Sequence, residues 1–212
     1  MSSRLDELIE TSLSGYVYDI AMVVHYIYQS KYVCAKLKSR QWYMFDGMRW
    51  VATEIGPYHD ISNDVVALYQ GVYDREEAQL AKLDANEQKP EIESLRKRLS
   101  KIEALIIKLK NVTFKESLCR ECMYLFYDSD FLSKLDKDRQ YICFRNGVLD
   151  IRTKEFRQGR REDYISLYID EEFTANSDDL QNKIPRFTTF RESVILKRKG
   201  GQHKFKMHQT SI

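Results

Sequence analysis

The sequence contains no apolar run of about 18 residues, the length that a helix needs to cross the hydrocarbon core of a bilayer. It also shows no secretory leader, and its four cysteines are scattered along the chain. We therefore expect no membrane partner and an intracellular, reducing location in which the thiols stay free.

Motifs for nucleotide binding and for common hydrolytic chemistry are missing as well. The loop Gly-x-x-x-x-Gly-Lys-Ser/Thr is absent, and so are Gly-x-Ser-x-Gly and His-Glu-x-x-His. Gly200-Gly201 stands beside a lysine but lacks the spacing of the phosphate loop. The paired carboxylates Glu162-Asp163 and Asp178-Asp179 are expected to be solvated, because nothing near them predicts a desolvated pocket. No cofactor and no catalytic residue is predicted, and no group of residues supports an enzymatic activity of this chain.

One cysteine pair has the spacing of a zinc or redox motif. Cys119 and Cys122 are separated by two residues, but they lie in a predicted helix without a second pair of ligands. We therefore interpret them as small buried side chains and predict no metal site. The histidines do not complete a ligand set in any evident way: His25, His59, His203 and His208.

Neither sign of charge dominates the composition. The chain has 34 basic and 32 acidic residues, so any nucleic-acid contact must come from local clusters. With 43% hydrophobic and 12% aromatic residues among 212, the chain can bury a core. One domain, or one domain with an arm, is expected.

Apolar residues recur at helical spacing over much of the first two thirds of the chain. A third helix is predicted to begin at a cap formed by Asp60 or Ser62 and to end near Asn86, and a capping box at residues 113–116 predicts another start. The remaining predicted helices are a lead-in over 3–12, a longer helix over 16–29, and a short one over 131–135.

A further stretch has the three-four spacing of a coiled-coil seam. With a turn at residues 86–90, it predicts an antiparallel helical hairpin that projects from the domain. The first arm has few large apolar residues, so the second arm is expected to pack against this domain or against another copy. The seam consists of Ile92, Leu95, Leu99, Ile102, Ile106 and Leu109.

Two segments are typical of small antiparallel sheets. Residues 32–35, 41–45 and 48–51 predict three strands, with Asp46-Gly47 as a hairpin turn. Asn146-Gly147 predicts a type I′ turn in a second meander, and the alternation of Ile165, Leu167 and Ile169 predicts a further strand. The predicted class is therefore α+β: two small antiparallel sheets packed with helices, plus the helical hairpin.

The second meander also carries a family resemblance. Phe144-Arg-Asn-Gly-Val-Leu-Asp150, followed by Phe156-Arg-x-Gly-Arg-x-Glu-Asp-Tyr-Ile-Ser166, resembles the domain before the motor in primase–helicases of poxviruses and giant DNA viruses. Related segments occur in phage and plasmid primases with superfamily 3 helicase motors. Leu135-Asp136 fits the same pattern. The motif residues that we expect to be structural are Trp42, Trp50, Asn146, Gly147, Asp150, Asp163 and Tyr164.

The resemblance implies a non-catalytic module that links primase and helicase parts and supports oligomer assembly or DNA positioning. It implies a pre-motor domain over 15–175, with the hairpin inserted at about 60–112, between a lead-in over 1–14 and a polar, basic tail over 176–212. The ATP-driven motor would lie outside these residues, and the site of action would be the host cytoplasm or nucleus, at viral replication sites. The alternative is a stand-alone interaction protein that oligomerises through its coiled-coil hairpin.

Basic residues near the two sheets are the candidates for nucleic-acid contact. Aromatic rings beside guanidinium and ammonium groups can stack bases and hold phosphates, although the same residues could equally form a solvated rim. Lys36, Lys38 and Arg40 flank the first sheet. The basic tail is a candidate for nonspecific phosphate binding, as any basic tail is. The residues assigned to a nucleic-acid site are Arg49, Arg157, Arg160 and Arg161.

Overall fold

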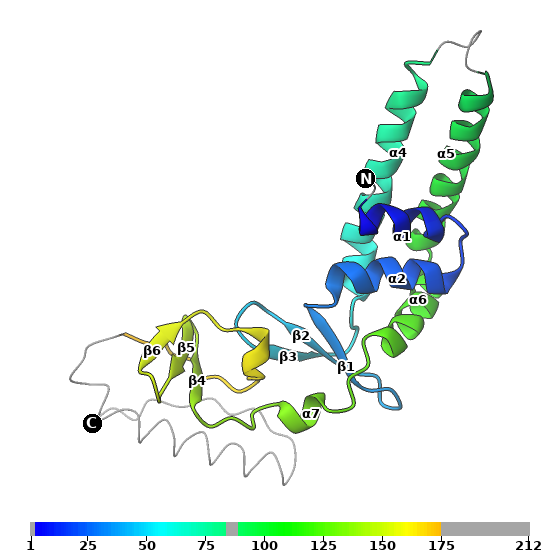
Figure 1. The fold of residues 1–212 in the computed structure, drawn as a ribbon. Coiled ribbons are helices and arrows are strands. Elements are labelled where there is room, and N and C mark those ends of the chain that lie inside the picture. The colour runs from blue at the N-terminus through cyan, green and yellow to red at the C-terminus, as the bar shows by residue number, and fades with distance from the viewer. Residues whose placement is uncertain (1–2, 84–88, 175–212) are drawn as a thin grey trace. The chain divides into compact units, whose positions relative to one another are not determined.

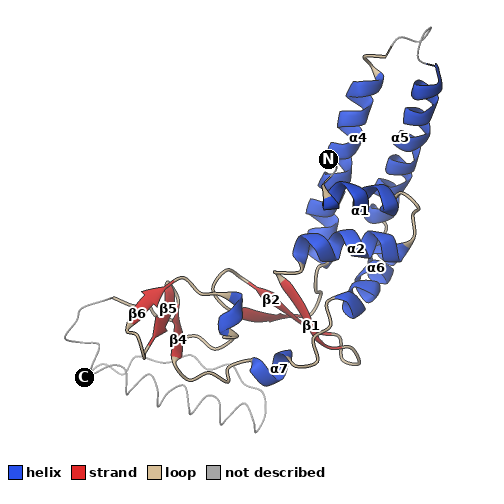
Figure 2. Cartoon of the chain, in the orientation of Figure 1, coloured by secondary structure: helices blue, strands red, loops and turns tan. Residues whose placement is uncertain are grey.

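The computed structural model describes residues 3–83 and 89–174, which divide into two compact units (Figure 1). Unit 1 comprises Met1–Met44 and Ala52–Ser129, and unit 2 comprises Phe45–Val51 and the chain from Asp130 onward. Helices and two three-stranded antiparallel sheets make up the fold, which confirms the α+β class (Figure 2). The predicted tail over 176–212 lies outside the described residues.

Unit 1 is mainly helical. None of the helices in the described part of the chain combines the length and hydropathy that a membrane crossing requires. The helices are α1 (Arg4–Ser12), α2 (Val17–Tyr28), α3 (Tyr58–Asp60), a π-helical turn (Ile61–Val65), α4 (Val66–Leu80), α5 (Lys89–Lys110) and α6 (Val112–Leu125).

The predicted starts of two helices are wrong, and the structure shows why. The third helix begins at Tyr58, and the carboxylate of Asp60 accepts hydrogen bonds from Lys31 and Tyr32 instead of capping it. Helix α6 is capped by Asn111, whose side chain accepts a hydrogen bond from the Phe114 amide at 3.1 Å. The expected capping box therefore lies inside the first turns of a helix that has already started.

Helices α4 and α5 form the predicted antiparallel hairpin. Helix α4 ends at Leu80, earlier than predicted, and Pro90 lies in the first turn of α5 rather than in a break. A proline is tolerated there because the first amides of a helix have no partner within the helix. The second half of the seam, from Leu99 to Leu109, is buried within the chain itself.

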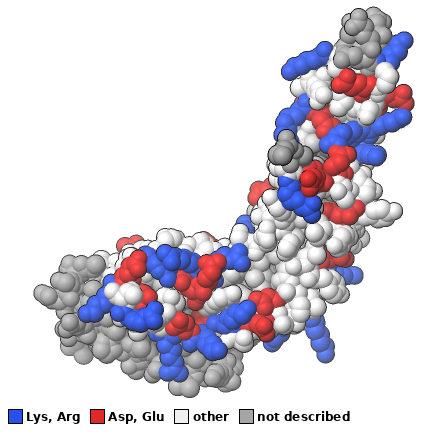
Figure 3. All heavy atoms as spheres, in the orientation of Figure 1, with Lys and Arg blue, Asp and Glu red and all other residues white. Residues whose placement is uncertain are grey.

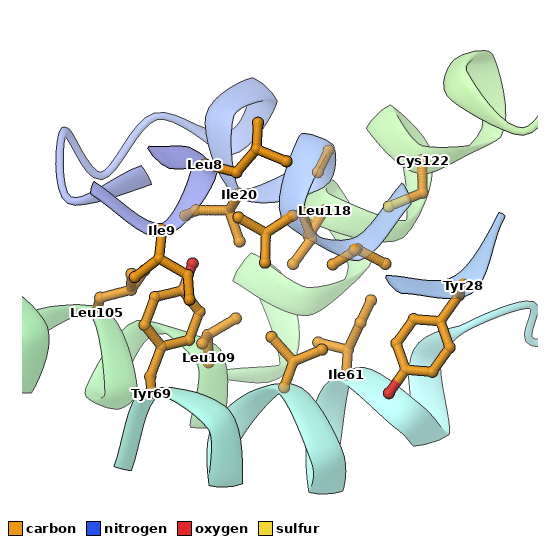
Figure 4. Packing of buried hydrophobic residues seen from close by; sticks show 14 of the residues in the cluster. Leu8, Ile9, Ile20, Tyr28, Ile61, Tyr69, Leu105, Leu109, Leu118 and Cys122 are labelled. Atoms are coloured by element: carbon orange, nitrogen blue, oxygen red, sulfur yellow. The ribbon is translucent and has the colours of Figure 1, made fainter. Parts of the chain in front are cut away.

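The core of unit 1 lies where α1 and α2 pack on the bases of α4, α5 and α6 (Figure 4). Ile20, Ile61 and Leu118 are completely buried there, and they come from three different helices. Tyr69 reaches into the same core, where its hydroxyl lies 2.6 Å from the Ser12 hydroxyl. This pairing satisfies two polar groups that would otherwise be costly to bury.

The first sheet has the order β1-β2-β3, with β1 (Tyr32–Lys36), β2 (Gln41–Phe45) and β3 (Trp50–Thr53). The predicted hairpin turn is present, but it runs from Asp46 to Arg49, so β3 begins at Trp50, two residues later than predicted. Gly47 has a φ of 96°, and the Asp46 carboxylate accepts the amides of Met48 and Arg49 at 2.8 Å each. Glycine supplies the positive φ and aspartate satisfies the turn amides.

Unit 2 contains α7 (Phe131–Lys134), a sheet of order β4-β5-β6 and a 3₁₀ turn (Arg161–Asp163). Its strands are short: β4 (Tyr141–Phe144), β5 (Gly147–Asp150) and β6 (Glu155–Arg157). The predicted further strand is wrong. Only Ile169 forms a bridge, with Phe144 and in parallel, because the carboxylate of Asp136 engages the amides of residues 166 and 167.

The predicted type I′ turn at Asn146-Gly147 is also wrong. Phe144 pairs with Gly147, so the loop residues are Arg145 and Asn146, and neither has a positive φ. Gly147 is instead the first residue of β5, where a Cβ would overlap the ring of Phe156. The glycine is thus required by close packing rather than by turn conformation.

Of the described glycines of unit 2, Gly159 lies closest to a neighbouring segment, and its packing generates a stability prediction. A Cβ at Gly159 would overlap the backbone carbonyl of Met48, which cannot move aside as a side-chain end could. We expect Gly159→Ala to lower the free energy of unfolding by about 2 kcal/mol, measured by urea denaturation. Gly71→Ala is the control. A Cβ at Gly71, an exposed position of α4, would meet no neighbouring atom within 4 Å, so this change should raise the free energy of unfolding by about 0.5–1 kcal/mol. Equal effects of the two changes would contradict the packing argument.

Candidate nucleic-acid interface

Arg157 is bound by the protein itself. Its guanidinium donates two hydrogen bonds to the carboxylate of Asp163, at 2.8 and 2.7 Å, and lies 5.3 Å from the centre of the Tyr141 ring. The side chains of this pair are only 13% and 6% exposed. The hydrogen bonds with Asp163 raise the pKa of Arg157 above its ordinary value, so the guanidinium stays charged and paired.

Asp163 connects β6 to the 3₁₀ turn. Besides Arg157, its carboxylate accepts the backbone amide of Arg160 at 2.8 Å, which fixes the start of the 3₁₀ turn. The turn ends at Tyr164, which has a φ of 47° and packs its ring 6.0 Å from that of Phe131. The family motif Glu-Asp-Tyr is therefore a structural element at this position.

Arg49 is also held in place. Its guanidinium donates a hydrogen bond to the carbonyl of Ser166 at 3.0 Å and stacks on the ring of Tyr168, with 3.7 Å between the guanidinium carbon and the ring centre. Asp46 lies 3.8 Å from the same group. A planar guanidinium suits this combined stacking and hydrogen bonding, which joins the first hairpin turn to residues 166–168.

Arg160 and Arg161 are the two predicted arginines that remain on the surface. The side chain of Arg161 is 44% exposed and lies 3.1 Å from the carboxylate of Glu162, which is itself 69% exposed. Its backbone carbonyl accepts a hydrogen bond from the indole of Trp50 at 2.8 Å. All four assigned arginines belong to unit 2, and of the four only this adjacent pair is exposed.

The two tryptophans among the expected structural residues pack in separate clusters. Trp50 lies in unit 2, with its ring centre 5.0 Å from that of Phe131. Trp42 lies in unit 1, against Phe126 at 5.7 Å. A Cβ on Gly56 would come within 2.7 Å of the Trp42 indole, so the glycine after this hairpin is also fixed by packing.

Asn146 and Asp150 satisfy loop amides. The Asn146 side chain donates to the Phe173 carbonyl at 3.0 Å and accepts the Phe173 amide at 2.8 Å, as a strand backbone would. Asp150 accepts the amide of Arg152 at 2.9 Å and that of Thr153 at 3.3 Å. Burial alone would raise the pKa of the Asp150 carboxyl, but these hydrogen bonds and the charge of Arg152 lower it overall.

Asp136 is a site-organising residue to which sequence reasoning assigned no role. Its carboxylate accepts the Ser166 amide at 2.7 Å, the Ser166 hydroxyl at 2.5 Å and the Leu167 amide at 3.2 Å. Its own amide donates to the carbonyl of Tyr164 at 2.7 Å. Leu135-Asp136 fits the family pattern, which was the one indication in the sequence that Asp136 has a role. Local sequence preferences cannot predict its contacts with residues 30 positions away.

The cysteines have the character of core residues. Cys119 and Cys122 lie on α6, and burial raises the pKa of Cys119 to about 12 and that of Cys122 well above its ordinary value. Such thiols stay protonated and are poor metal ligands. In residues 3–83 and 89–174, no three histidine, cysteine, aspartate or glutamate side chains gather as a metal site would require.

The sequence matches a protein-family model described as "D5 N terminal like" over residues 21–195. Three curated viral proteins are similar to the chain. A mimivirus protein named "Putative helicase L207/L206" is 29% identical over 205 residues, covering 91% of the chain and 21% of that protein. "Putative helicase 022R" of frog virus 3 is 26% identical over 175 residues, covering 69% and 18%.

The third relative, "Putative helicase 121R" of invertebrate iridescent virus 3, is 34% identical over 83 residues, which is 37% of the chain and 9% of that protein. The chain thus spans about a fifth or less of the length of these relatives. The match to the family model, over residues 21–195, includes the motif residues of unit 2 and most of the helices of unit 1.

The Arg157–Asp163 pair generates a second stability prediction. Asp163→Asn leaves a largely buried guanidinium without its counter-charge, so we expect the free energy of unfolding to fall by about 3 kcal/mol. Glu162→Gln is the matched control, since its exposed pair with Arg161 should contribute no more than about 0.5 kcal/mol. Urea denaturation measures both variants. A loss of stability for Asp163→Asn no greater than for Glu162→Gln would contradict the structural role of the pair.

Proposed function

The chain belongs to the D5 N-terminal-like family, and we propose that it acts as a non-catalytic module of a viral DNA-replication primase–helicase. In this role it links the primase and helicase parts and positions DNA or neighbouring subunits. The observation that carries the proposal is the family match over most of the chain, together with relatives named putative helicases that are roughly four times as long as this chain.

The chemistry of the described residues supports a role without bond-making steps. Carboxylates of unit 2 are engaged with backbone amides, as Asp136 and Asp163 are, and burial raises the pKa of the Cys119 thiol. The sequence contains no phosphate-binding loop. The nucleotide-hydrolysing part would thus be supplied by other segments of a longer polypeptide or by a separate chain.

The DNA part of the proposal rests on surface charge. Since Arg157 and Arg49 are held by the protein, Arg160 and Arg161 are the predicted arginines of unit 2 that stay exposed for contact with phosphates. The mechanism would be electrostatic and independent of base sequence.

An ATPase and DNA-binding experiment tests this function. The full chain should not hydrolyse ATP, with or without DNA, and robust turnover would overturn the non-catalytic assignment. It should bind single-stranded DNA at low salt, and Arg160→Ala with Arg161→Ala should weaken binding and reduce the salt slope by about 1.4, as expected for two phosphate contacts. The control is Arg75→Ala with Arg96→Ala, which removes the same charge from the helical hairpin. An equal effect of both double variants would remove the DNA role of unit 2.

Subunit assembly is a second candidate function, favoured by exposed apolar side chains. Tyr16, Ile107 and Val112 are 73%, 64% and 58% exposed. Ile107 lies near the end of α5 and Val112 begins α6. Tyr16 follows Gly15, at which a Cβ would lie 3.0 Å from the ammonium of Lys108 in α5. Exposed apolar surface of this kind is typical of protein contacts. The coiled-coil seam itself is occupied within the chain from Leu99 onward.

We expect Ile107→Asp with Val112→Asp to lower the molar mass in solution, since two charges would have to be buried in a contact between copies. Multi-angle light scattering measures the mass over a range of protein concentrations. Ser100→Asp with Ser117→Asp adds the same charges at exposed polar positions of the same helices and should leave the mass unchanged. A monomeric native chain at high concentration would overturn this candidate.

A further inference from the structure

One stretch of unit 1 is basic without compensation. From residue 20 to residue 45 the sequence has no aspartate or glutamate but has four lysine or arginine residues, in a chain whose total charge is nearly balanced. Lys31 is paired, because its ammonium donates to the carboxylate of Asp60 at 2.6 Å. The other three, Lys36, Lys38 and Arg40, lie in the β1–β2 hairpin.

These three cations contrast with the arginines of unit 2. All three are exposed, and across residues 3–83 and 89–174 none of them forms an ion pair. In unit 2, Arg157 faces Asp163, Arg49 faces Asp46 and Arg145 faces Asp170. The β1–β2 loop therefore holds three exposed cations that no carboxylate of the described residues pairs with.

The loop that carries the cations is structurally fixed. Lys36 pairs with Gln41, and the amide of Arg40 donates to the carbonyl of Leu37 at 3.2 Å. Leu37 packs against the core of unit 1, and Arg40 has a φ of 49°. Figures 1 and 3 show the hairpin loop and basic side chains standing out from it. Little conformational entropy of the loop would be lost when an anion binds to it.

Exposed tyrosines lie beside this loop. Asp128 donates its amide to the carbonyl of Cys34, and the Cys34 amide donates to Phe126 at 2.9 Å. Tyr127 therefore runs next to β1, two positions before Lys36, and is 45% exposed. Tyr124 lies three residues before Tyr127, in the last turn of α6, and is 63% exposed. Arg120 lies one helical turn before Tyr124 on the same face of α6 and is also exposed.

We propose that the β1–β2 loop and the outer face of α6 form a binding site for single-stranded nucleic acid. Lys36, Lys38 and Arg40 contact phosphates, and Tyr124 and Tyr127 stack unpaired bases. Spaced cations beside exposed aromatic rings suit a single strand, whose bases are free to stack, better than a duplex or an acidic peptide. This inference rests on the proposed DNA-positioning function. It assigns that function a second site, in unit 1, whereas Arg49, Arg157, Arg160 and Arg161 all lie in unit 2.

The test uses the full chain and a fluorescent oligothymidylate. The oligonucleotide is longer than about 16 nucleotides, the upper end of the site sizes of known single-strand-binding folds. Lys36→Gln, Lys38→Gln and Arg40→Gln together should reduce the slope of log K against log salt by about 2, as expected for three phosphate contacts. Tyr124→Ala with Tyr127→Ala should weaken binding at least about fivefold and leave that slope unchanged. The control, Arg96→Gln, Lys101→Gln and Lys110→Gln, removes the same charge from α5 and should bind like the native chain. Circular dichroism and thermal melting confirm that each variant is folded.

The outcomes separate this site from the general proposal. A native chain that binds no oligothymidylate at low salt overturns both. A loop variant that binds like the native chain, while Arg160→Ala with Arg161→Ala loses affinity, overturns the unit 1 site alone. A tyrosine variant with native affinity, or a duplex or polyglutamate that competes as well as the single strand, overturns the assignment to single strands.

Discussion

Carboxylates that accept backbone amides hold unit 2 together. Its strands have only three or four residues, so strand pairing leaves many loop amides without partners. Asp46, Asp136, Asp150 and Asp163 each accept at least one of these amides, and all four are aspartates close to turns. The lowered pKa of Asp150 expresses the same interaction thermodynamically. Its stabilisation is fully present above the unfolded-state pKa and is lost as the pH falls through the folded-state value.

This dependence on aspartate explains why the arginines of the motif are poor guides to function. A guanidinium close to a buried carboxylate is drawn into the structure, as Arg157 is by Asp163, because an unpaired buried charge would be far more costly. The β1–β2 loop differs because residues 20–45 contain no acidic residue, and within the described parts of the chain none of the three loop cations forms an ion pair. In this chain, a stretch without acidic residues therefore predicts a lysine or arginine that is free to contact a ligand better than the presence of arginine does.

Periodic signals were sufficient where the structure is regular. The bounds of β2 at 41–45 were predicted, and the apolar rhythm of α2 and α5 located both helices to within a few residues. These segments bury one continuous face, so tertiary contacts reinforce the local preference. The α+β class followed from the same periodicities.

The errors occur where a side chain far away in sequence decides the backbone. Asn146-Gly147 looks like a hairpin turn, but the ring of Phe156 needs the space at Gly147, and the Asn146 amide pairs with Phe173. Likewise, Asp136 holds residues 166 and 167 away from strand pairing. Turn propensity amounts to at most a few kcal/mol and is easily overridden by such contacts.

The same reasoning separates what each unit can contribute to binding. In unit 2 most motif side chains are engaged in maintaining a fold with little regular structure, so a substitution there changes stability and binding together. Unit 1 has an extensive apolar core, and its loop cations can vary without loss of packing. A charged surface placed on an independently stabilised hairpin is one whose contribution to nucleic-acid affinity can be measured without altering the fold.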